Sequence, residues 1–323
     1  MSSATQSPPI AGDVTVRGMR EADLPDVARI VRVAFGTFFG LPDPQTLWPD
    51  RDPITTRWRA APDSSLVAVV NGRVIGSNFL TNWGSVAFFG PLTIEPEFWN
   101  QGVAQKLLGP TVDQFDKWGA KDSGLFTFAQ STKHVNLYQK FGYWPRFLTA
   151  VMSKTVDGPA SVESALFSEL NEAQRQEAVA ACAEVTGAIT DGLDVRVDIL
   201  SVRNQNLGDT VLIWSGDALD AFAVCHCGPG TEAGADICYL KFAAVRPGKN
   251  AGRAFDQLLL ACEGLTASRG LHRVEAGINL GRSAAYRAML AHGFRSQMQG
   301  VAMHRPDSPG YSRPEVYVID DWR

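Results

Sequence analysis

The chain has 323 residues, a length that predicts two domains with separate hydrophobic cores. Its formal net charge of −4 provides no basic surface of the kind that binds nucleic acids or anionic membranes, so we expect neither as a partner. The apolar fraction of 45% is ordinary for a soluble protein, and no apolar run approaches the roughly 20 residues of a membrane helix.

The N-terminus and the cysteines both indicate a cytoplasmic protein. The first residues, MSSATQSPPI, lack the charged and apolar regions of a signal peptide, and we interpret them as a polar leader. The five cysteines are odd in number and lack C-x-x-C spacing, which favours buried free thiols over disulfides. In a strand, Cys225-His226-Cys227 would turn its thiols to one face and its imidazole to the other, so we expect no metal site there.

The first elements in chain order are a strand, a helix, a loop and a hairpin. Residues 14–17 predict a short strand, and a helix with an apolar stripe follows, with Asp23 as its N-cap and Pro25 in its first turn. Residues 36–55 are rich in Gly, Pro and aromatics and predict an irregular loop, either the wall of a binding site or a loop that packs its own small core. Residues 66–80 predict a hairpin with a type I′ turn at Asn71-Gly72.

The central stretch of the chain is residues 88–108, FFGPLTIEPEFWNQGVAQKLL. Residues 85–94 predict one buried strand, and a helix then runs to about Trp118 with Gly119 as its C-cap. Free N–H groups and the dipole at the start of that helix would favour a bound anion such as phosphate. Gly102 and Ala104 would keep the approach open, because bulkier side chains would hold a phosphate away from the amides. An ordinary strand-to-helix turn explains the same residues.

A strand at 124–129, a helix at 131–141 that ends at Gly142 and a strand at 143–154 follow. With this element order, residues 12–155 resemble the GNAT N-acyltransferase superfamily. VRGMREAD is similar to the family's opening, LTIEPEFWNQGVAQKLL to its pyrophosphate motif Gln/Arg-x-x-Gly-x-Gly/Ala, and NLYQKFGY to its closing motif. Trp99 stands where the pyrophosphate motif has Gln or Arg, a departure that bears on affinity more than on the fold.

The resemblance implies an α/β fold, in which a mixed, mostly antiparallel and twisted sheet is flanked by helices, and acetyl-CoA as co-substrate. It implies that the pantetheine lies along a strand backbone, that a helix N-terminus holds the pyrophosphate, and that residues of the closing helix add contacts. The corresponding residues are Leu92, Thr93 and Ile94, then Gln101, Gly102, Val103, Ala104 and Gln105, and finally Ser131 and Asn136. The backbone N–H of Thr93 would serve the oxyanion.

Tyr138 and Glu95 are the expected catalytic residues. The family's motif has a tyrosine at the position of Tyr138, and a phenol with a pKa near 10 can protonate an alkyl thiolate of comparable basicity. Glu95 ends the predicted central strand and is the expected general base, acting through water. A core-facing tyrosine and a surface carboxylate at a strand end are the alternatives for these two residues.

A linker at 157–162 precedes a second set of similar elements. Gly102 and Gly142 are 40 residues apart, and Gly252 and Gly293 are 41 apart, which predicts an internal duplication. We therefore expect two tandem GNAT-like domains, 12–156 and 157–323, an arrangement distantly similar to that of mycothiol synthases. Met289 stands at the position of Tyr138, so the second domain is expected to be degenerate, and Asn279 is expected to cap its last helix.

Taken together, the sequence predicts an acyl-CoA-dependent N-acetyltransferase that acts by direct attack of a primary amine of a small molecule. The acceptor amine itself is not encoded in any motif of the chain, and the sequence is compatible with a homodimer. Two alternatives stay open at this point. The protein could be a non-catalytic CoA-binding or regulatory protein, or its active site could lie in the second domain.

Overall fold

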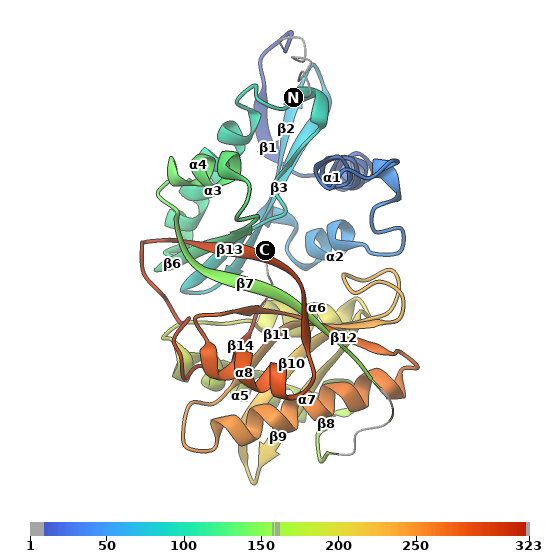
Figure 1. The fold of residues 1–323 in the computed structure, drawn as a ribbon, viewed down its shortest axis with the longest axis vertical. Helices are drawn as coiled ribbons and strands as arrows, with labels where there is room; N and C mark the ends of the chain where they lie inside the picture. The colour runs from blue at the N-terminus through green and yellow to red at the C-terminus, as the bar shows by residue number, and fades with distance from the viewer. Residues whose placement is uncertain (1–9, 157, 159–161, 321–323) are drawn as a thin grey trace.

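The computed structural model describes residues 10–156, 158 and 162–320. Most of the predicted leader and linker therefore lies outside the described residues. In Figure 1 the chain forms two stacked halves, and one sheet passes through both. We call residues 10–156 the first half and residues 162–320 the second half.

The first half alternates strands with helices in the predicted order. Its elements are β1 (Thr15–Gly18), α1 (Leu24–Phe38), α2 (Pro53–Ala60), β2 (Ser65–Val70), β3 (Arg73–Trp83), β4 (Val86–Phe89), β5 (Thr93–Ile94), α3 (Val103–Trp118), β6 (Asp122–Thr127), α4 (Thr132–Gln139) and β7 (Trp144–Thr155). Helices α1 and α3 lie on opposite sides of this part of the sheet in Figure 1. Successive side chains of β2 point to opposite faces of the sheet, so each face can bury one helix. Val67 packs with α1, and Ala68 packs with α3.

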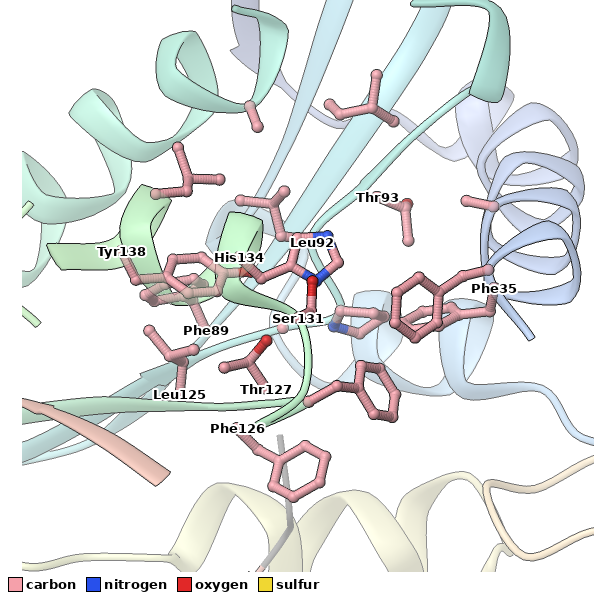
Figure 2. Close-up of a pocket in the computed structure, with 18 of the residues that line it drawn as sticks. Phe35, Phe89, Leu92, Thr93, Leu125, Phe126, Thr127, Ser131, His134 and Tyr138 are labelled. Carbon is pink, nitrogen blue, oxygen red and sulfur yellow. The ribbon is translucent and has the colours of Figure 1, made fainter. Parts of the chain in front are cut away.

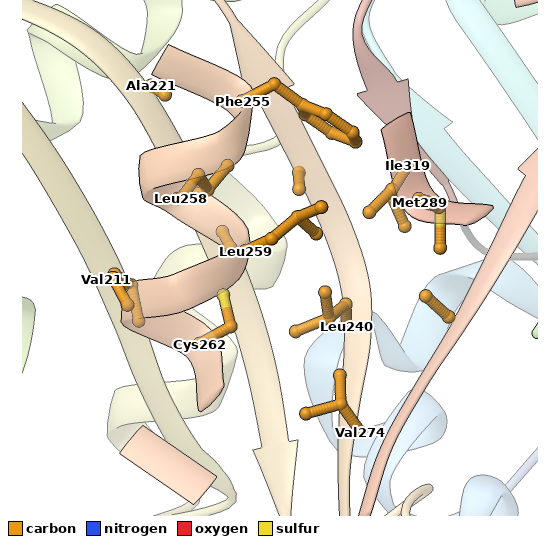
Figure 3. Close-up of a cluster of buried hydrophobic side chains, with 14 of the residues drawn as sticks. Val211, Ala221, Leu240, Phe255, Leu258, Leu259, Cys262, Val274, Met289 and Ile319 are labelled. Carbon is orange, nitrogen blue, oxygen red and sulfur yellow. The ribbon is translucent and has the colours of Figure 1, made fainter. Parts of the chain in front are cut away.

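The second half repeats the sequence hairpin, strand, helix, strand, helix and strand. Its elements are β8 (Ala165–Leu166), α5 (Glu172–Ile189), α6 (Arg196–Asn204), β9 (Gly208–Ser215), β10 (Ala218–Cys227), β11 (Ile237–Val245), α7 (Ala251–Ser268), β12 (Arg273–Asn279), α8 (Ser283–Ala291), β13 (Arg295–Arg305) and β14 (Val318–Ile319). Figure 3 shows its main core, in which Phe255, Leu258 and Leu259 of α7 pack towards the strands. No helix within the described ranges is long and apolar enough to cross a membrane.

Strand pairing is mostly antiparallel, which confirms the predicted α/β class with a mixed sheet. Among the described residues the sheet has 14 strands in the order β1-β2-β3-β4-β6-β13-β7-β12-β11-β10-β9-β8, with β5 on β3 and β14 on β11. The strand that follows the closing helix of each half is exchanged: β7 pairs with β12 of the second half, and β13 pairs with β6 of the first. The halves therefore share one sheet, and the predicted boundary after residue 156 stays a prediction.

Two local predictions need correction, and a third is confirmed. Asp23 stands at the N-cap position of α1 but does not cap it, because its carboxylate binds the Arg17 guanidinium at 2.6 and 2.8 Å. The irregular segment 36–55 is partly helical, since α1 continues to Phe38 and α2 begins at Pro53. The type I′ turn at Asn71-Gly72 is confirmed, because both residues have positive φ, 49° and 79°.

The prediction of a single strand over residues 85–94 is wrong, and the break in this strand forms one side of the candidate site. It is broken at Gly90-Pro91 into β4 and β5, because Pro91 has no N–H to continue the ladder. Strand β4 pairs with β6 in parallel from Val86 to Phe88, whereas β5 pairs only with β3. Beyond Phe88 the backbone therefore leaves β6, and a gap opens between the two strands.

Candidate active site

A cavity of about 630 Å³ occupies the gap between β5 and β6. Figure 2 shows side chains from β4, the β4–β5 connection, β6, α1 and α4 around it. Nine of the ten residues predicted to bind the donor line it, namely Leu92, Thr93, Ile94, Gly102, Val103, Ala104, Gln105, Ser131 and Asn136. The tenth, Gln101, is turned to other partners: its amide group accepts from the Ile10 N–H at 2.8 Å and donates to the Glu97 carbonyl at 3.1 Å.

One end of the cavity is the N-terminus of α3, which is built to receive an anion. Gly102 has φ 78° at the N-cap position, and no side chain caps the helix. Within the described ranges, the amides of residues 100–104 donate to no backbone carbonyl. These free donors and the positive end of the helix dipole favour negative charge at this end. The lining lysines Lys133 and Lys140 add positive charge on α4 and just after it.

Trp99, the departure from the pyrophosphate motif, has a structural role at this end. Its indole N–H donates to the Ile94 carbonyl at 2.7 Å and so ties the turn before α3 to the end of β5. The Lys133 ammonium lies 5.8 Å from the centre of its ring, close enough for a cation–π contact. The substitution therefore fixes the geometry of the two elements that form the gap.

Tyr138 lies on α4 with its ring against Phe89 at a centroid distance of 5.7 Å (Figure 2). It lines the cavity and is only 8% exposed, and this burial raises its pKa well above the ordinary value near 10. Its hydroxyl has no hydrogen-bond partner within the described residues. The phenol thus stays protonated over the whole physiological pH range and is available as a hydrogen-bond donor. Its raised pKa, however, removes the match in basicity with an alkyl thiolate on which the predicted role as general acid was based.

Glu95 is not brought together with Tyr138. Its side chain is buried, but it does not line the cavity, and its two carboxylate oxygens bind Arg29 at 2.5 Å and Arg73 at 2.6 Å. Each carboxylate oxygen thus already accepts a hydrogen bond from a guanidinium group. Glu95 joins α1 and β3 to the end of β5, an arrangement suited to holding the backbone rather than to accepting a proton from a substrate.

His134 is the titratable residue that the sequence analysis missed. It lies one helical turn before Tyr138, lines the cavity, and has its ring 5.5 Å from that of Phe38. Burial, and secondarily the charge of Lys133, lower its pKa below the ordinary 6.5, so the imidazole is neutral at pH 7. Neither ring nitrogen has a hydrogen-bond partner in the described part of the chain. The i, i+4 spacing from Tyr138 is the sequence signal that could have identified it.

The other end of the cavity is aromatic. It is lined by Phe35 and Phe38 of α1, by Phe39 at the C-cap of α1, by Trp48 of the following loop and by Phe128 after β6. The ring centroids of Phe38 and Phe128 are 4.8 Å apart, and those of Phe35 and Trp48 are 5.6 Å apart. Residues of the segment 36–55 therefore line the cavity, while Trp48 also packs against the buried cluster that contains Ile54, so the structure carries features of both interpretations.

The second half completes the cavity with Glu232, Tyr239 and Met298. The Glu232 carboxylate binds Arg57 of α2 at 2.5 Å and Lys241 of β11 at 2.6 Å. Arg57 in turn donates to the Gly90 carbonyl at 2.9 Å. The break between β4 and β5 is thus held by an ion pair that crosses between the halves.

The equivalent gap of the second half is filled by its own chain. Strands β11 and β12 pair in parallel only from Ile237 to Leu240, and β14 then takes the place beside β11. The buried Arg282 binds the Val318 carbonyl and the Asp320 carboxylate, which fixes this segment. Met289 at the position of Tyr138 is fully buried in the core. Asn279 does not cap α8, because its side-chain oxygen accepts from the Gly281 amide.

Comparisons with known proteins agree with this geometry. Residues 31–143, which begin within α1 and include α2 to α4 and the α3 end of the cavity, match the model of the Acetyltransferase (GNAT) family. Sequence comparison with curated proteins gives no match. The distant likeness to mycothiol synthases stays a prediction.

Solved structures share the fold over almost the whole chain. A putative acetyltransferase from Pyrococcus horikoshii has a TM-score of 0.69 at 12% identity, with 99% of each chain covered. A GCN5-related N-acetyltransferase from Sphaerobacter thermophilus has a TM-score of 0.62 at 17% identity, with 90% of this chain and 95% of that chain covered. At such identities the likeness shows the fold alone, and that fold is the one found in GNAT enzymes. The similarity to the GNAT acetyltransferase family in sequence therefore rests on residues 31–143.

Proposed function

We propose that the protein transfers an acetyl group from acetyl-CoA to the primary amine of a small molecule, in the cavity of the first half. The observation that carries the proposal is the gap between β5 and β6, which joins the free amides of α3 to a chamber lined by His134 and Tyr138. A long, anionic donor and a second substrate would meet in such a site.

The donor is expected to enter with its pyrophosphate at the α3 end. The amides of residues 102–104 would bind phosphate oxygens, whereas the Gln105 amide already donates to the Gly102 carbonyl at 3.1 Å. The edge of β5 at Leu92, Thr93 and Ile94 would bind the pantetheine through its backbone. Ser131 and Asn136 on the α4 side would close over the arm. The thioester would then lie in the middle of the cavity, between these residues and the aromatic end.

The transfer needs one proton acceptor and one proton donor. His134 takes a proton from the substrate ammonium, and the freed nitrogen lone pair attacks the thioester carbonyl carbon. The C–O double bond opens to an oxyanion, which a backbone N–H on the open edge of β5 would stabilise. The Thr93 N–H predicted for this role faces Ser77 of β3 in the antiparallel ladder instead. When the oxyanion collapses, the C–S bond breaks and the CoA thiolate takes the proton of Tyr138. An amide and free CoA leave, and solvent restores the Tyr138 proton.

The second half is proposed to support this site rather than to contain another one. Its equivalent gap holds β14, and its position matching Tyr138 is the buried Met289. A non-catalytic CoA-binding protein is the remaining alternative. It is less well supported, because a protein that only binds CoA does not need a proton donor and a proton acceptor in the cavity. The Tyr138 phenol and the neutral His134 imidazole, which lack hydrogen-bond partners among the described residues, could supply both.

The direct test is release of CoA thiol from acetyl-CoA in the presence of a panel of primary amines. We expect amine-dependent release, and a loss of at least about 10²-fold in kcat for Tyr138→Phe with an unchanged KM for acetyl-CoA. Tyr286→Phe is the matched control, because it removes a phenol at the start of the second half's closing helix. Acetyl-CoA binding without turnover of any amine would favour the non-catalytic alternative.

A further inference from the structure

Six aromatic side chains surround the end of the cavity that lies away from α3, and we call this end the aromatic compartment. Its members line the cavity from α1, from the loop after it and from the end of β6, and they are Phe35, Phe38, Phe39, Trp48, Phe126 and Phe128. The rings contact one another: Phe39 meets Phe128 edge-on at 5.5 Å, and Phe126 meets Phe128 at 6.0 Å. Such rings offer both faces and edges to a further ring, the arrangement that aromatic groups prefer.

The aromatic compartment adjoins the proposed base. Phe38 contacts the His134 ring on one side and the Phe128 ring on the other. In Figure 2, Phe35 enters from α1 and His134 from α4, on two sides of the same space. An amine within reach of His134 therefore has the remainder of its molecule directed into the aromatic compartment.

The charges around the cavity limit the acceptor to one ammonium group. The lining cations are Arg51, Arg57, Lys133 and Lys140. Within the described lining the only carboxylate is Glu232, and its charge is already balanced by Arg57 and Lys241. Arg51 is paired with Glu275, so Lys133 and Lys140 supply the remaining positive charge of the lining, and a second ammonium on the substrate would add like charge without a counter-charge.

The second half contributes side chains of the same character. Tyr239 is 3% exposed and presents a ring at the cavity, and Met298 presents a flexible thioether. Methionine sulfur makes favourable contacts with aromatic rings and adapts to their shape. The apolar surface is therefore continuous across the two halves, whereas a sugar would require buried hydrogen-bond partners for each of its hydroxyl groups.

We infer that the acceptor is a monoamine whose single ammonium is carried on a short chain attached to an aromatic ring, with the ring bound in the aromatic compartment. This inference rests on the proposed function, whose site it describes in more detail. Polyamines, amino sugars and amines on short polar chains are the classes that it excludes.

Calorimetry on the protein saturated with CoA tests the inference without requiring turnover. The probes are 2-phenylethylamine, spermidine and glucosamine. We expect 2-phenylethylamine to bind at least about tenfold more tightly than the other two. Phe38→Leu and Phe128→Leu should weaken its binding about three- to tenfold, the range for loss of a pair of aromatic contacts, and leave acetyl-CoA binding unchanged. Phe141→Leu, a ring outside the cavity lining, should leave both unchanged.

Two results would overturn the inference. Spermidine or glucosamine could bind as tightly as the aromatic amine, or both Leu variants could bind 2-phenylethylamine as well as the Phe141→Leu control does. The proposed function fails separately, if acetyl-CoA itself does not bind to the wild-type protein. Each failure is therefore read from a different titration.

Discussion

Replacing His134 by Gln tests the assignment of the proton acceptor. Glutamine keeps a hydrogen-bonding side chain of similar length but cannot take up a proton, so the variant would act only on amine that is already neutral in solution. A primary alkylamine has a pKa near that of lysine, about 10.4, so only roughly one molecule in 10³ is neutral at pH 7. We therefore expect His134→Gln to lower kcat/KM at pH 7 by about 10²- to 10³-fold, within the range for general-base catalysis.

The shape of the pH profile gives the sharper test. Because burial lowers the His134 pKa, wild-type kcat/KM should fall only when the pH drops below about 6.5. In His134→Gln the value should instead rise about tenfold per pH unit until the pKa of the amine is reached, so that the two enzymes converge near pH 10. Burial keeps Tyr138 protonated, so Tyr138→Phe should lower activity without changing the acid limb.

The control is His272→Gln, which removes an exposed imidazole that pairs with Asp236 outside the cavity. It should leave the profile unchanged. If His134→Gln keeps the wild-type acid limb and most of the activity at pH 7, then His134 does not accept the proton and the reasoning from its neutral, accessible ring is refuted.

Three further predictions concern the shared sheet and the ion pair between the halves. Gly300→Ala should destabilise the protein by about 1–3 kcal/mol in urea unfolding, because a Cβ there would overlap the Phe126 ring and the Thr127 carbonyl; Gly109→Ala, on the open side of α3, is the control. Glu232→Gln should cost up to about 3–5 kcal/mol, because it removes the negative charge nearest to two buried cations and leaves Lys241 with Asp198 at 4.0 Å; equal melting of wild type and variant would contradict this. A fragment ending at residue 156 should fail to fold, as judged by circular dichroism and aggregation, because β6 and β7 lose their pairing with β13.

Features that depend on nearby residues could be predicted from the sequence. The hairpin at Asn71-Gly72 and the end of α3 at Gly119 depend on residues with positive φ, and the helices depend on an apolar period of 3.6. The N-terminus of α3 was predicted from its small residues for the same reason. The α3 end of the site could therefore be anticipated in detail.

Features that depend on long-range pairing could not. Nothing in the segments 144–155 and 295–305 specifies that β7 and β13 exchange halves, because their alternating patterns fit either neighbour equally well. Glu95 was expected in the cavity from its place at a strand end, whereas the positions of Arg29 and Arg73 decide where its carboxylate points. The only sequence signal for His134 is its i, i+4 spacing from Tyr138, and the aromatic surroundings that mark it, with Phe38 beside it, are formed only by folding.

The central claim is that acetyl-CoA binds at the N-terminus of α3, and one pair of matched variants tests it most directly. Ala104→Glu puts a carboxylate beside the free amides without the backbone strain that a substitution of Gly102, at φ 78°, would add. Gly109→Glu adds the same charge to the same helix, at a position with open space and outside the cavity lining.

The measurement is calorimetric titration of acetyl-CoA into the wild-type protein and both variants. The account predicts about one site per chain in the wild type and in Gly109→Glu, and no measurable binding in Ala104→Glu. Binding to Ala104→Glu as tight as binding to Gly109→Glu, or no binding to the wild type at millimolar acetyl-CoA, would contradict it.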